Sequence, residues 1–125
     1  MSIILEAAGG ASIRINVWNW GVLHHLVAAA DVLPDEVWAP KRYNGGGDLD
    51  PAQVTALADF LARELLPRLR PGERMYFDGT VTDVPDDGTL YREEAELWKN
   101  YSLHRDVLEN VIDFLRSAAG AVSVC

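Results

Sequence analysis

The sequence predicts an α+β domain in which a small antiparallel sheet, made from an N-terminal β-hairpin and a C-terminal strand, packs against about three helices. Three observations indicate this fold class. Apolar and polar residues alternate near both ends of the sequence, as they do in half-buried strands. Three longer segments between them repeat apolar residues at helical spacing. The 125 residues, 49% of them hydrophobic, suffice for one core, so we expect a single domain over residues 1–125.

Two short strands are expected near the N-terminus. Residues 2–6 include two isoleucines, and within residues 12–17 the side chains of Ile13 and Ile15 share one face. The small residues 7–11 between them contain a Gly-Gly pair, which is typical of a turn. The pattern therefore predicts a β-hairpin.

The first helix is predicted over residues 20–33. Its apolar side chains recur at spacings of three and four, Asn19 is its expected N-cap, and Pro34 ends it. We expect a loop over residues 34–49, which contain two prolines and the run Asn-Gly-Gly-Gly at 44–47. That run lacks the lysine and the spacing of a phosphate-binding loop, so a flexible turn is expected there.

The second helix has the clearest start signal in the sequence. Residues 50–53, Asp-Pro-Ala-Gln, combine a capping box with a proline at the first helical position. Apolar residues at helical spacing follow, and Pro67 and Pro71 bracket the end of this helix.

A third helix is predicted over residues 102–119, with Ser102 as its N-cap and Gly120 as its stop. Residues 121–125 then alternate apolar and polar side chains, as a short strand does. A strand at this end of the chain pairs most easily with the N-terminal hairpin.

Residues 71–101 are the least regular part of the sequence. Within them, residues 75–77 favour a short strand and residues 93–99 a short helix. The segment holds eight acidic and three basic residues, a net charge of −5. Long irregular segments in small domains are often functional.

The whole chain has 19 acidic and 11 basic residues, a net charge of −8. This charge disfavours binding to nucleic acids and anionic membranes, and it favours a basic protein as partner. The single cysteine, Cys125, excludes an intramolecular disulfide and a cysteine-based zinc site. The sequence has no signal-peptide pattern, no long apolar run and no cofactor motif, so we expect a cytoplasmic protein without a cofactor.

Residues 15–20, Ile-Asn-Val-Trp-Asn-Trp, lead from a predicted strand into a predicted helix. Together with the closing segment 114–122, they resemble a group of small uncharacterised bacterial proteins. That group shares an Asn-x-Trp-Asn-Trp junction, a Leu/Ala-rich middle helix and a closing helix–Gly–strand. The closing turn is Ala-Ala-Gly here and Gly-Gly in the group. The resemblance covers most of the chain and implies the same α+β layout, but no function, because the group has no known activity.

Residues 83–94 match part of a calcium-binding EF-hand loop. Asp83, Asp87 and Glu94 occupy loop positions 1, 5 and 12, and a glycine stands at position 6. Pro85, at position 3, supplies no side-chain ligand, and no helical pattern precedes the loop. The favoured interpretation is therefore an acidic, solvated loop, with calcium binding as the weaker alternative.

The three histidines differ in their expected surroundings. His24 and His25 fall off the apolar stripe of the first helix, so we expect both to face solvent. His104 is expected in the first turn of the third helix, near the centre of its apolar face. A half-buried histidine there is a candidate general base, and the sequence identifies no nucleophile to accompany it.

Four tryptophans are a high number for 125 residues. We expect Trp18 and Trp20 to cover the junction between the hairpin and the first helix. Trp38 and Tyr43 fall in the segment predicted as a loop, beside two basic residues. Such an aromatic pair is either tucked under the loop or offered to a partner.

The leading functional hypothesis is a non-enzymatic protein-interaction or regulatory module, such as an immunity-like protein that neutralises a toxin. Its binding residues are expected in two segments, with Trp38 and Tyr43 in one and Asp83, Asp86 and Asp87 in the other. The size of the chain, its acidity and the lack of a catalytic motif favour this hypothesis.

The alternative is a small enzyme or ligand-binding domain. Its site would lie where His104 meets the 71–101 segment, with Tyr76 or the glutamates at 93–94 as polar helpers. A homodimer is compatible with either hypothesis, because the strand expected over residues 121–125 is a candidate edge strand.

Overall fold

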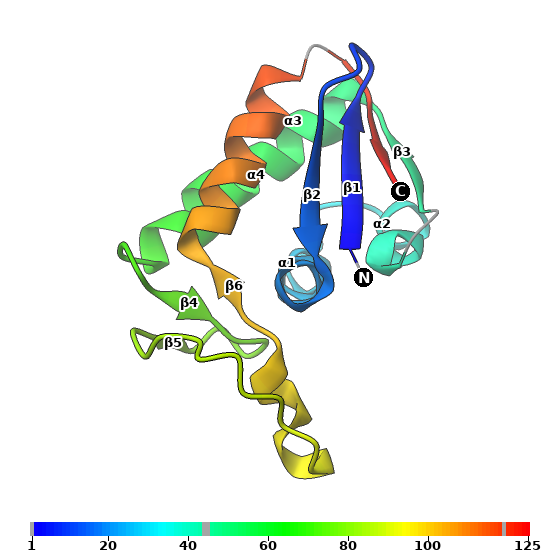
Figure 1. The fold of residues 1–125 in the computed structure, drawn as a ribbon. Helices are drawn as coiled ribbons and strands as arrows, with labels where there is room; N and C mark the ends of the chain where they lie inside the picture. Colours follow the sequence, from blue (N-terminus) through cyan, green and yellow to red (C-terminus); the bar gives the residue numbers. More distant parts are fainter. Residues whose placement is uncertain (1, 44–45, 119) are drawn as a thin grey trace.

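A computed structural model describes residues 2–43, 46–118 and 120–125 of the protein. Its larger sheet is antiparallel, with four strands in the order β2-β1-β7-β3 (Figure 1). These strands are β1 (Ser2–Ala7), β2 (Ser12–Asn16), β3 (Gly47–Leu49) and β7 (Val122–Val124). The predicted α+β class is confirmed, with the N-terminal hairpin and the C-terminal strand in one sheet.

The C-terminal strand lies inside the sheet. β7 pairs with β1 on one side and with β3 on the other. The prediction that this strand forms an edge is therefore wrong, and the edges are β2 and β3. β3 has only three residues, within the segment predicted as a loop. So short a strand has no sequence pattern of its own, and it forms because β7 offers it backbone hydrogen-bond partners.

The first helix, α1 (Val17–Ala29), starts earlier than predicted. Its N-cap is Asn16, and the prediction of Asn19 in this role is wrong. Asn16 keeps an extended backbone while its side-chain oxygen accepts the backbone N–H of Asn19 at 2.9 Å, as an N-cap residue does. The helix therefore begins where β2 ends, with no residue between them.

The segment expected to be a loop is mostly ordered as short elements. α2 (Asp35–Trp38) leads directly into a 3₁₀ helix, η1 (Ala39–Arg42), before β3. Residues 44 and 45 of the glycine-rich run lie outside the described residues, so the turn expected there is not described in full. Trp38 is buried, and its Nε1 donates to the carbonyl of His24 on α1. These contacts hold α2 and η1 against α1.

The predicted capping box at the start of α3 (Pro51–Phe60) is confirmed. The side chain of Asp50 accepts the backbone N–H of Gln53, and the side chain of Gln53 accepts the backbone N–H of Asp50. The helix continues as a π-helical turn, η2 (Leu61–Leu65), and a 3₁₀ turn, η3 (Leu66–Arg68).

The last helix, α4 (Arg105–Ser117), packs against α3, as Figure 1 shows. The prediction that it starts at Ser102 is wrong. Residues Leu103–His104 form β6, which pairs with β4 (Arg74–Met75) and so delays the helix. β4 also pairs with β5 (Val81–Thr82), which completes a second, three-stranded sheet.

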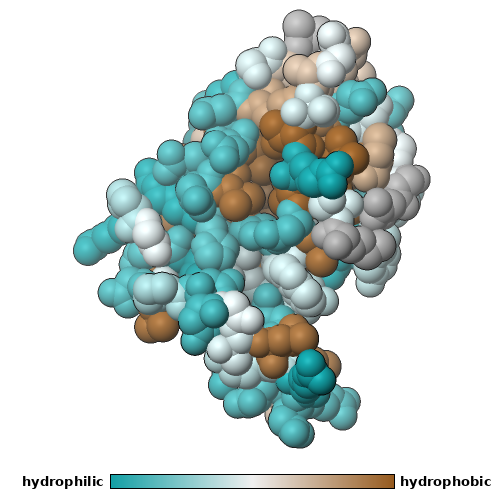
Figure 2. Space-filling model, in the orientation of Figure 1, coloured by the Kyte–Doolittle hydropathy of each residue, from teal (hydrophilic) through white to brown (hydrophobic). Residues whose placement is uncertain are grey.

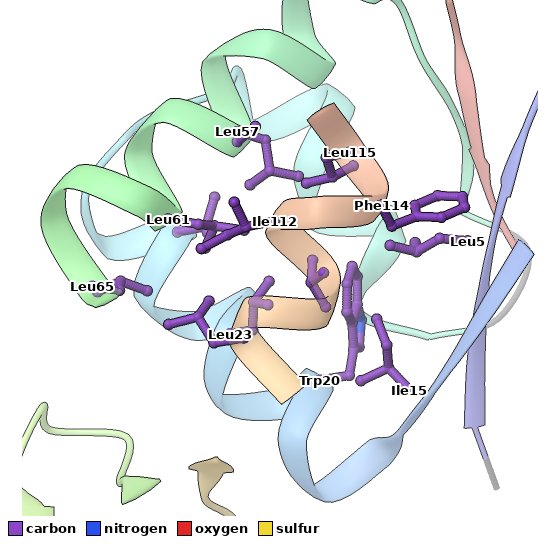
Figure 3. Packing of buried hydrophobic residues seen from close by; sticks show 14 of the residues in the cluster. Leu5, Ile15, Trp20, Leu23, Leu57, Leu61, Leu65, Ile112, Phe114 and Leu115 are labelled. Atoms are coloured by element: carbon purple, nitrogen blue, oxygen red, sulfur yellow. The ribbon is translucent and has the colours of Figure 1, made fainter. Parts of the chain in front are cut away.

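The core lies between the four-stranded sheet and the helices. Figure 3 shows leucine, isoleucine and aromatic side chains from the sheet and from α1, α3, η2 and α4 packed in one cluster. Met75 and Leu103, in the second sheet, belong to the same cluster and are fully buried. One core therefore joins both sheets. In the described part of the chain, no helix is long and apolar enough to span a membrane.

Residues 83–101, which we call the arm, extend away from this body (Figure 1). The arm starts after β5, contains the 3₁₀ helix η4 (Glu94–Asn100) and leads back to β6. η4 occupies the region where a short helix was expected. None of the arm residues belongs to the buried core cluster.

Candidate functional site

The arm concentrates negative charge at the surface. It contains six acidic and two basic residues, a net charge of −4 in 19 residues. The predicted binding residues Asp83, Asp86 and Asp87 all lie at its start and are exposed. The arm thus carries half of the net charge of −8 that the whole chain has.

Apolar side chains are exposed on the same arm. Leu90, Leu97 and Trp98 are 54%, 44% and 45% exposed, which is high for large hydrophobic residues. Figure 2 shows a small brown, apolar area among hydrophilic residues on the part of the molecule that Figure 1 identifies as the arm. Large apolar surface with a polar rim marks interaction sites in soluble proteins.

A hollow of about 410 Å³ lies where the arm meets α1. Its apolar walls come from Trp18 on α1 and from Leu90, Leu97 and Tyr101 on the arm. The remaining lining residues are Tyr91, Arg92 and Asn100. The hollow is within the size range of sites that bind a large side chain or a small ligand.

A second, smaller hollow of about 290 Å³ lies beside Trp98 and is also lined by Phe77 and Asp78. The indole ring of Trp98 meets the ring of Tyr76 edge-on, with 5.1 Å between the ring centres. Tyr76 therefore supports an exposed tryptophan, whereas it was expected to assist His104 chemically.

A row of aromatic rings fastens the arm to the body. Tyr101 contacts Trp18 edge-on at 4.9 Å and Phe77 at 5.2 Å, and Phe77 contacts His25 at 5.4 Å, all measured between ring centres. Gly21 gives this row room on α1, since a Cβ atom there would lie 3.1 Å from the ring of Tyr101.

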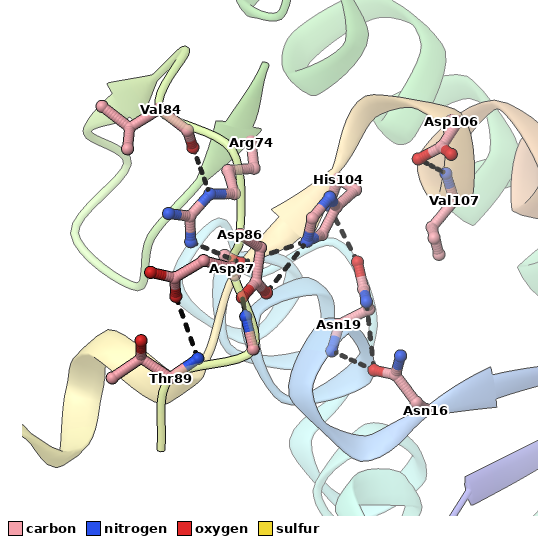
Figure 4. Close-up of polar contacts among 12 residues, drawn as sticks. Asn16, Asn19, Arg74, Val84, Asp86, Asp87, Thr89, His104, Asp106 and Val107 are labelled. Carbon is pink, nitrogen blue, oxygen red and sulfur yellow. Dashed lines mark hydrogen bonds and ion pairs between the residues drawn. The ribbon is translucent and has the colours of Figure 1, made fainter. Parts of the chain in front are cut away.

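Hydrogen bonds within the arm join its middle to its C-terminal end and shape its start. The side chain of Asn100 accepts the backbone N–H of Tyr91 and donates to its carbonyl, both at 2.8 Å. Near its start, Asp87 accepts the backbone N–H of Thr89 at 2.9 Å, as Figure 4 shows. The hydroxyl and backbone N–H of Thr89 lower the pKa of the Asp87 carboxyl, so this carboxylate is charged at neutral pH.

A polar cluster lies at the base of the arm. Arg74 is 8% exposed, and its guanidinium donates to the carbonyl of Val84 at 3.0 Å and to Ser102 Oγ at 3.2 Å (Figure 4). His104 Nε2 lies 3.6 Å from a carboxylate oxygen of Asp86. The cluster therefore connects β4 and β6 to the first residues of the arm.

The same cluster brings a serine, a histidine and an aspartate together, but not as a nucleophilic triad. Ser102 Oγ lies 3.5 Å from His104 Nε2, the nitrogen that Asp86 also faces. In a triad the carboxylate holds the other ring nitrogen, Nδ1. Ser102 is also 2% exposed, so an incoming substrate does not reach it. We interpret the cluster as a set of structural contacts that hold the start of the arm against β4 and β6.

His104 differs from its predicted position. It is the N-cap residue of α4 with an extended backbone, and it does not lie on the apolar face of the helix. Its backbone N–H donates to Asn19 Oδ1 at 2.8 Å. The half-buried His104 lines a hollow of about 250 Å³ together with Pro71, Gly72, Glu73, Arg105, Asp106 and Glu109. The glutamates at 93–94, proposed as helpers, do not line it.

The partial calcium pattern does not form a cluster of ligands. Among the residues described, no three His, Cys, Asp or Glu side chains are grouped so as to hold a metal ion, and this includes Asp83, Asp87 and Glu94. Asp86 and Asp87 each accept a backbone N–H two residues ahead, so they form turns of the loop.

The other predicted surface is only half present. Tyr43 is exposed and lies under the guanidinium of Arg42, but Trp38 is 1% exposed. Its ring stacks on His24 at 4.7 Å, and its Nε1 donates to the carbonyl of His24 at 3.0 Å. The prediction that Trp38 contacts a partner is thus inconsistent with its burial, and the tucked arrangement is the observed one.

His24 is buried, so the prediction that it faces solvent is wrong, whereas His25 is exposed as expected. The helical wheel indicates one apolar stripe, but η1 and the Trp38 side chain of α2 pack against a second side of α1. The Nε2 of His24 lies 2.8 Å from the carbonyl of Trp38 and donates to it. Burial lowers the pKa of His24, and the nearby charge of Arg42 adds to the effect.

The structure gives a role to each residue of the Asn-x-Trp-Asn-Trp junction. Asn16 caps α1, Asn19 holds the start of α4, Trp18 lines the hollow, and Trp20 is buried with its Nε1 donating to the carbonyl of Lys41. The expected role of Trp20 at the junction agrees with its burial. Comparison with protein-family models, curated proteins and solved structures finds no match, so the resemblance built on this junction stays a prediction.

Sequence reasoning missed the exposed residues Leu90, Leu97 and Trp98. A signal for them was present, because an acidic, irregular segment that nonetheless contains large apolar residues is unusual. The sequence could not show that these side chains stay outside the core, since that depends on where the arm projects.

Proposed function

We propose that the protein is a non-enzymatic interaction module whose arm binds a basic protein, as an inhibitory or immunity-like protein binds its target. One observation carries the proposal: a projecting, acidic segment presents an apolar hollow at its junction with the body. The lone cysteine favours a reducing compartment, and we propose the cytoplasm.

Charge supports the choice of a basic partner. The arm's net charge of −4 attracts a positive surface and speeds encounter, which is how electrostatic complementarity acts at protein interfaces. The same charge repels nucleic acids. Exposed carboxylates such as Asp83 cost little to desolvate at the rim of an interface, so they provide steering and specificity more than affinity.

Apolar contact supports the choice of the hollow as the anchoring point. Large apolar or aromatic residues in a pocket, surrounded by a polar rim, provide most of the binding energy at interfaces. Here Leu97 and Leu90 stand beside Trp18, which is held by its contact with Tyr101. We propose that the partner inserts one apolar side chain between them.

Selection of random peptides on the full chain tests the proposal. We expect the selected peptides to combine lysine or arginine with one large apolar residue. A synthetic peptide of the selected sequence should bind more weakly as salt is raised, because salt screens the rim charges. Titration calorimetry at two salt concentrations measures this.

Two variants separate the charge from the hollow. The triple variant Asp83→Asn, Asp86→Asn, Asp87→Asn keeps the acceptors of the turn bonds and should weaken binding about tenfold. Leu97→Ala should weaken it by about 1–2 kcal/mol. A matched control, Asp31→Asn, Asp35→Asn, Glu36→Gln, changes the charge equally outside the arm and should bind as the wild type does. Selected peptides without basic residues, or wild-type affinity in both arm variants, would refute the proposal.

A small ligand-binding or enzymatic site at His104 is the second candidate. It rests on the half-buried imidazole beside a hollow of about 250 Å³. Three carboxylates line that hollow with one arginine, Arg105, which pairs with Glu109 at 2.6 Å. The remaining carboxylates, Glu73 and Asp106, give the hollow a net negative charge that favours a cationic small molecule. A thermal-shift panel of amines and diamines tests it: stabilisation that disappears in Glu109→Gln supports this site, and no stabilisation by any amine contradicts it.

A further inference from the structure

A hollow of about 590 Å³ lies away from the arm, between β2 and α4. Ile13, Val107, Val111 and Phe114 give it an apolar floor. Figure 2 shows apolar surface in this region of the molecule. The functional proposal for the arm does not use this surface.

β2 borders this hollow as an edge strand with free backbone groups. The backbone N–H and C=O groups of Ile4 bond to Cys125, on the side of β1 away from β2. The backbone groups of Ile3 and Leu5 therefore point toward β2, where these residues pair with Ile15 and Ile13. The N–H and C=O groups of Ser12 and Arg14 therefore point outward, where no strand of the described residues covers them. Such an edge can accept another strand.

Charges around the hollow are self-complementary. Arg14 on β2 and Asp113 on α4 both line it and are exposed. Neither makes an ion pair with any described residue, including each other. A surface with one unpaired charge of each sign matches a second copy of itself across a two-fold axis.

We infer that the protein forms a homodimer in which β2 of one copy pairs antiparallel with β2 of the other. Arg14 of each copy then faces Asp113 of the other, and the two α4 helices meet over their apolar residues. In this register Arg14 of one copy stands opposite Ser12 of the other. The two Arg14 side chains are not directly opposite each other, because like charges in that position destabilise a sheet.

The second copy fits this edge better than a basic partner does. The guanidinium of Arg14 at the middle of the edge repels a basic segment, whereas β2 itself provides the required alternation of apolar and polar side chains. The arm lies outside this interface, so both surfaces can be occupied together.

Charge swapping tests the inference. Sedimentation equilibrium of the full chain from about 1 μM to about 1 mM should show a monomer–dimer equilibrium. Arg14→Glu and Asp113→Arg should each weaken the dimer about tenfold or more, and the double variant should restore it. Arg63→Glu, the same change at an exposed residue outside the hollow, should leave it intact. The arm variants should leave it intact as well, which separates this test from that of the proposed function.

Amide exchange provides a second measurement that needs no variant. The outward N–H groups of Ser12 and Arg14 should exchange quickly in dilute protein and become protected as the concentration rises. A chain that stays monomeric at millimolar concentration, a dimer that both single charge reversals leave unchanged, or a dimer with unprotected Ser12 and Arg14 would overturn the inference.

Discussion

Two buried polar side chains, His24 and Lys41, show how individual residues hold α1 and the segment that follows it in place. His24 stacks on Trp38 and donates to its carbonyl, while Trp38 donates to the carbonyl of His24. Lys41 is buried nearby, where its Nζ donates to the carbonyls of Val37 and Gly46. Burial lowers the pKa of both His24 and Lys41. Backbone carbonyls accept hydrogen bonds from both groups, which offsets the cost of burying them.

The lowered pKa of His24 predicts that stability depends on pH. The unfolded chain takes up a proton near the ordinary value of 6.5, but the folded chain resists it until a lower pH. The free energy of unfolding should therefore fall as the pH drops below 6.5 toward about 5, a range above the pKa values of ordinary carboxyl groups. Urea denaturation at several pH values measures this.

Histidine variants provide the control for that measurement. In His24→Gln the free energy of unfolding should change little between pH 6.5 and about 5. In His25→Gln, at the exposed neighbour, it should fall with pH as it does in the wild type. Equal slopes in the two variants would show that another group causes the effect.

Among the elements, the arm depends most on specific side-chain contacts. It has no core residues, and aromatic contacts of Tyr101, the Asn100 clamp and the polar cluster around Arg74 hold it to the body and to itself. Segments with few buried contacts open at low free-energy cost. The arm should therefore be the first element to open in the native protein.

Removal of the Asn100 clamp should loosen the arm without unfolding the protein. Asn100→Ala loses two hydrogen bonds to the backbone of Tyr91, each worth about 0.5–1.5 kcal/mol. We expect a protease to cleave this variant faster within residues 83–101, while the body stays folded. Mass spectrometry of the fragments identifies the cleavage sites and their rates. Asn110→Ala, the same change at an exposed position of α4, should be cleaved at the same rate as the wild type. Equal cleavage of both variants would contradict a role for the clamp.

For the molecule as a whole, one core joins two sheets. Met75 and Leu103 on the small sheet are fully buried in the same cluster as Ile3 and Leu5 on the large one. The hydrogen bond from the backbone N–H of His104 to Asn19 further links the small sheet to α1. These connections predict that the body unfolds cooperatively, as a single domain does.

Two leucine variants test that prediction. Leu103→Ala, within the core, should lower the free energy of unfolding by about 2–5 kcal/mol. The unfolding midpoints measured by tryptophan fluorescence and by far-ultraviolet circular dichroism should shift by the same amount. Leu97→Ala, on the arm, should change stability by no more than about 0.5 kcal/mol. Separate transitions for the two probes in Leu103→Ala would show that the sheets unfold independently.

Features that depend on neighbours along the chain could be predicted from the order of the amino acids alone. The hairpin, the capping box at Asp50 and the helical stripes all rest on patterns within a few residues, and the structure contains each of them. The acidity of residues 71–101 is likewise read directly from the sequence. Helix boundaries were less well determined. At Ser102, the pairing of Leu103–His104 with β4 overrode a good local cap signal.

Which side chains meet depends on how the elements pack in three dimensions. It placed β7 inside the sheet, buried His24 and Trp38 against each other, and joined His104 to Asn19 across 85 positions of sequence. It also left the arm outside the core and so made its apolar residues a surface. Local patterns do not encode these outcomes, because the free energy of burial depends on which distant segments cover a side chain.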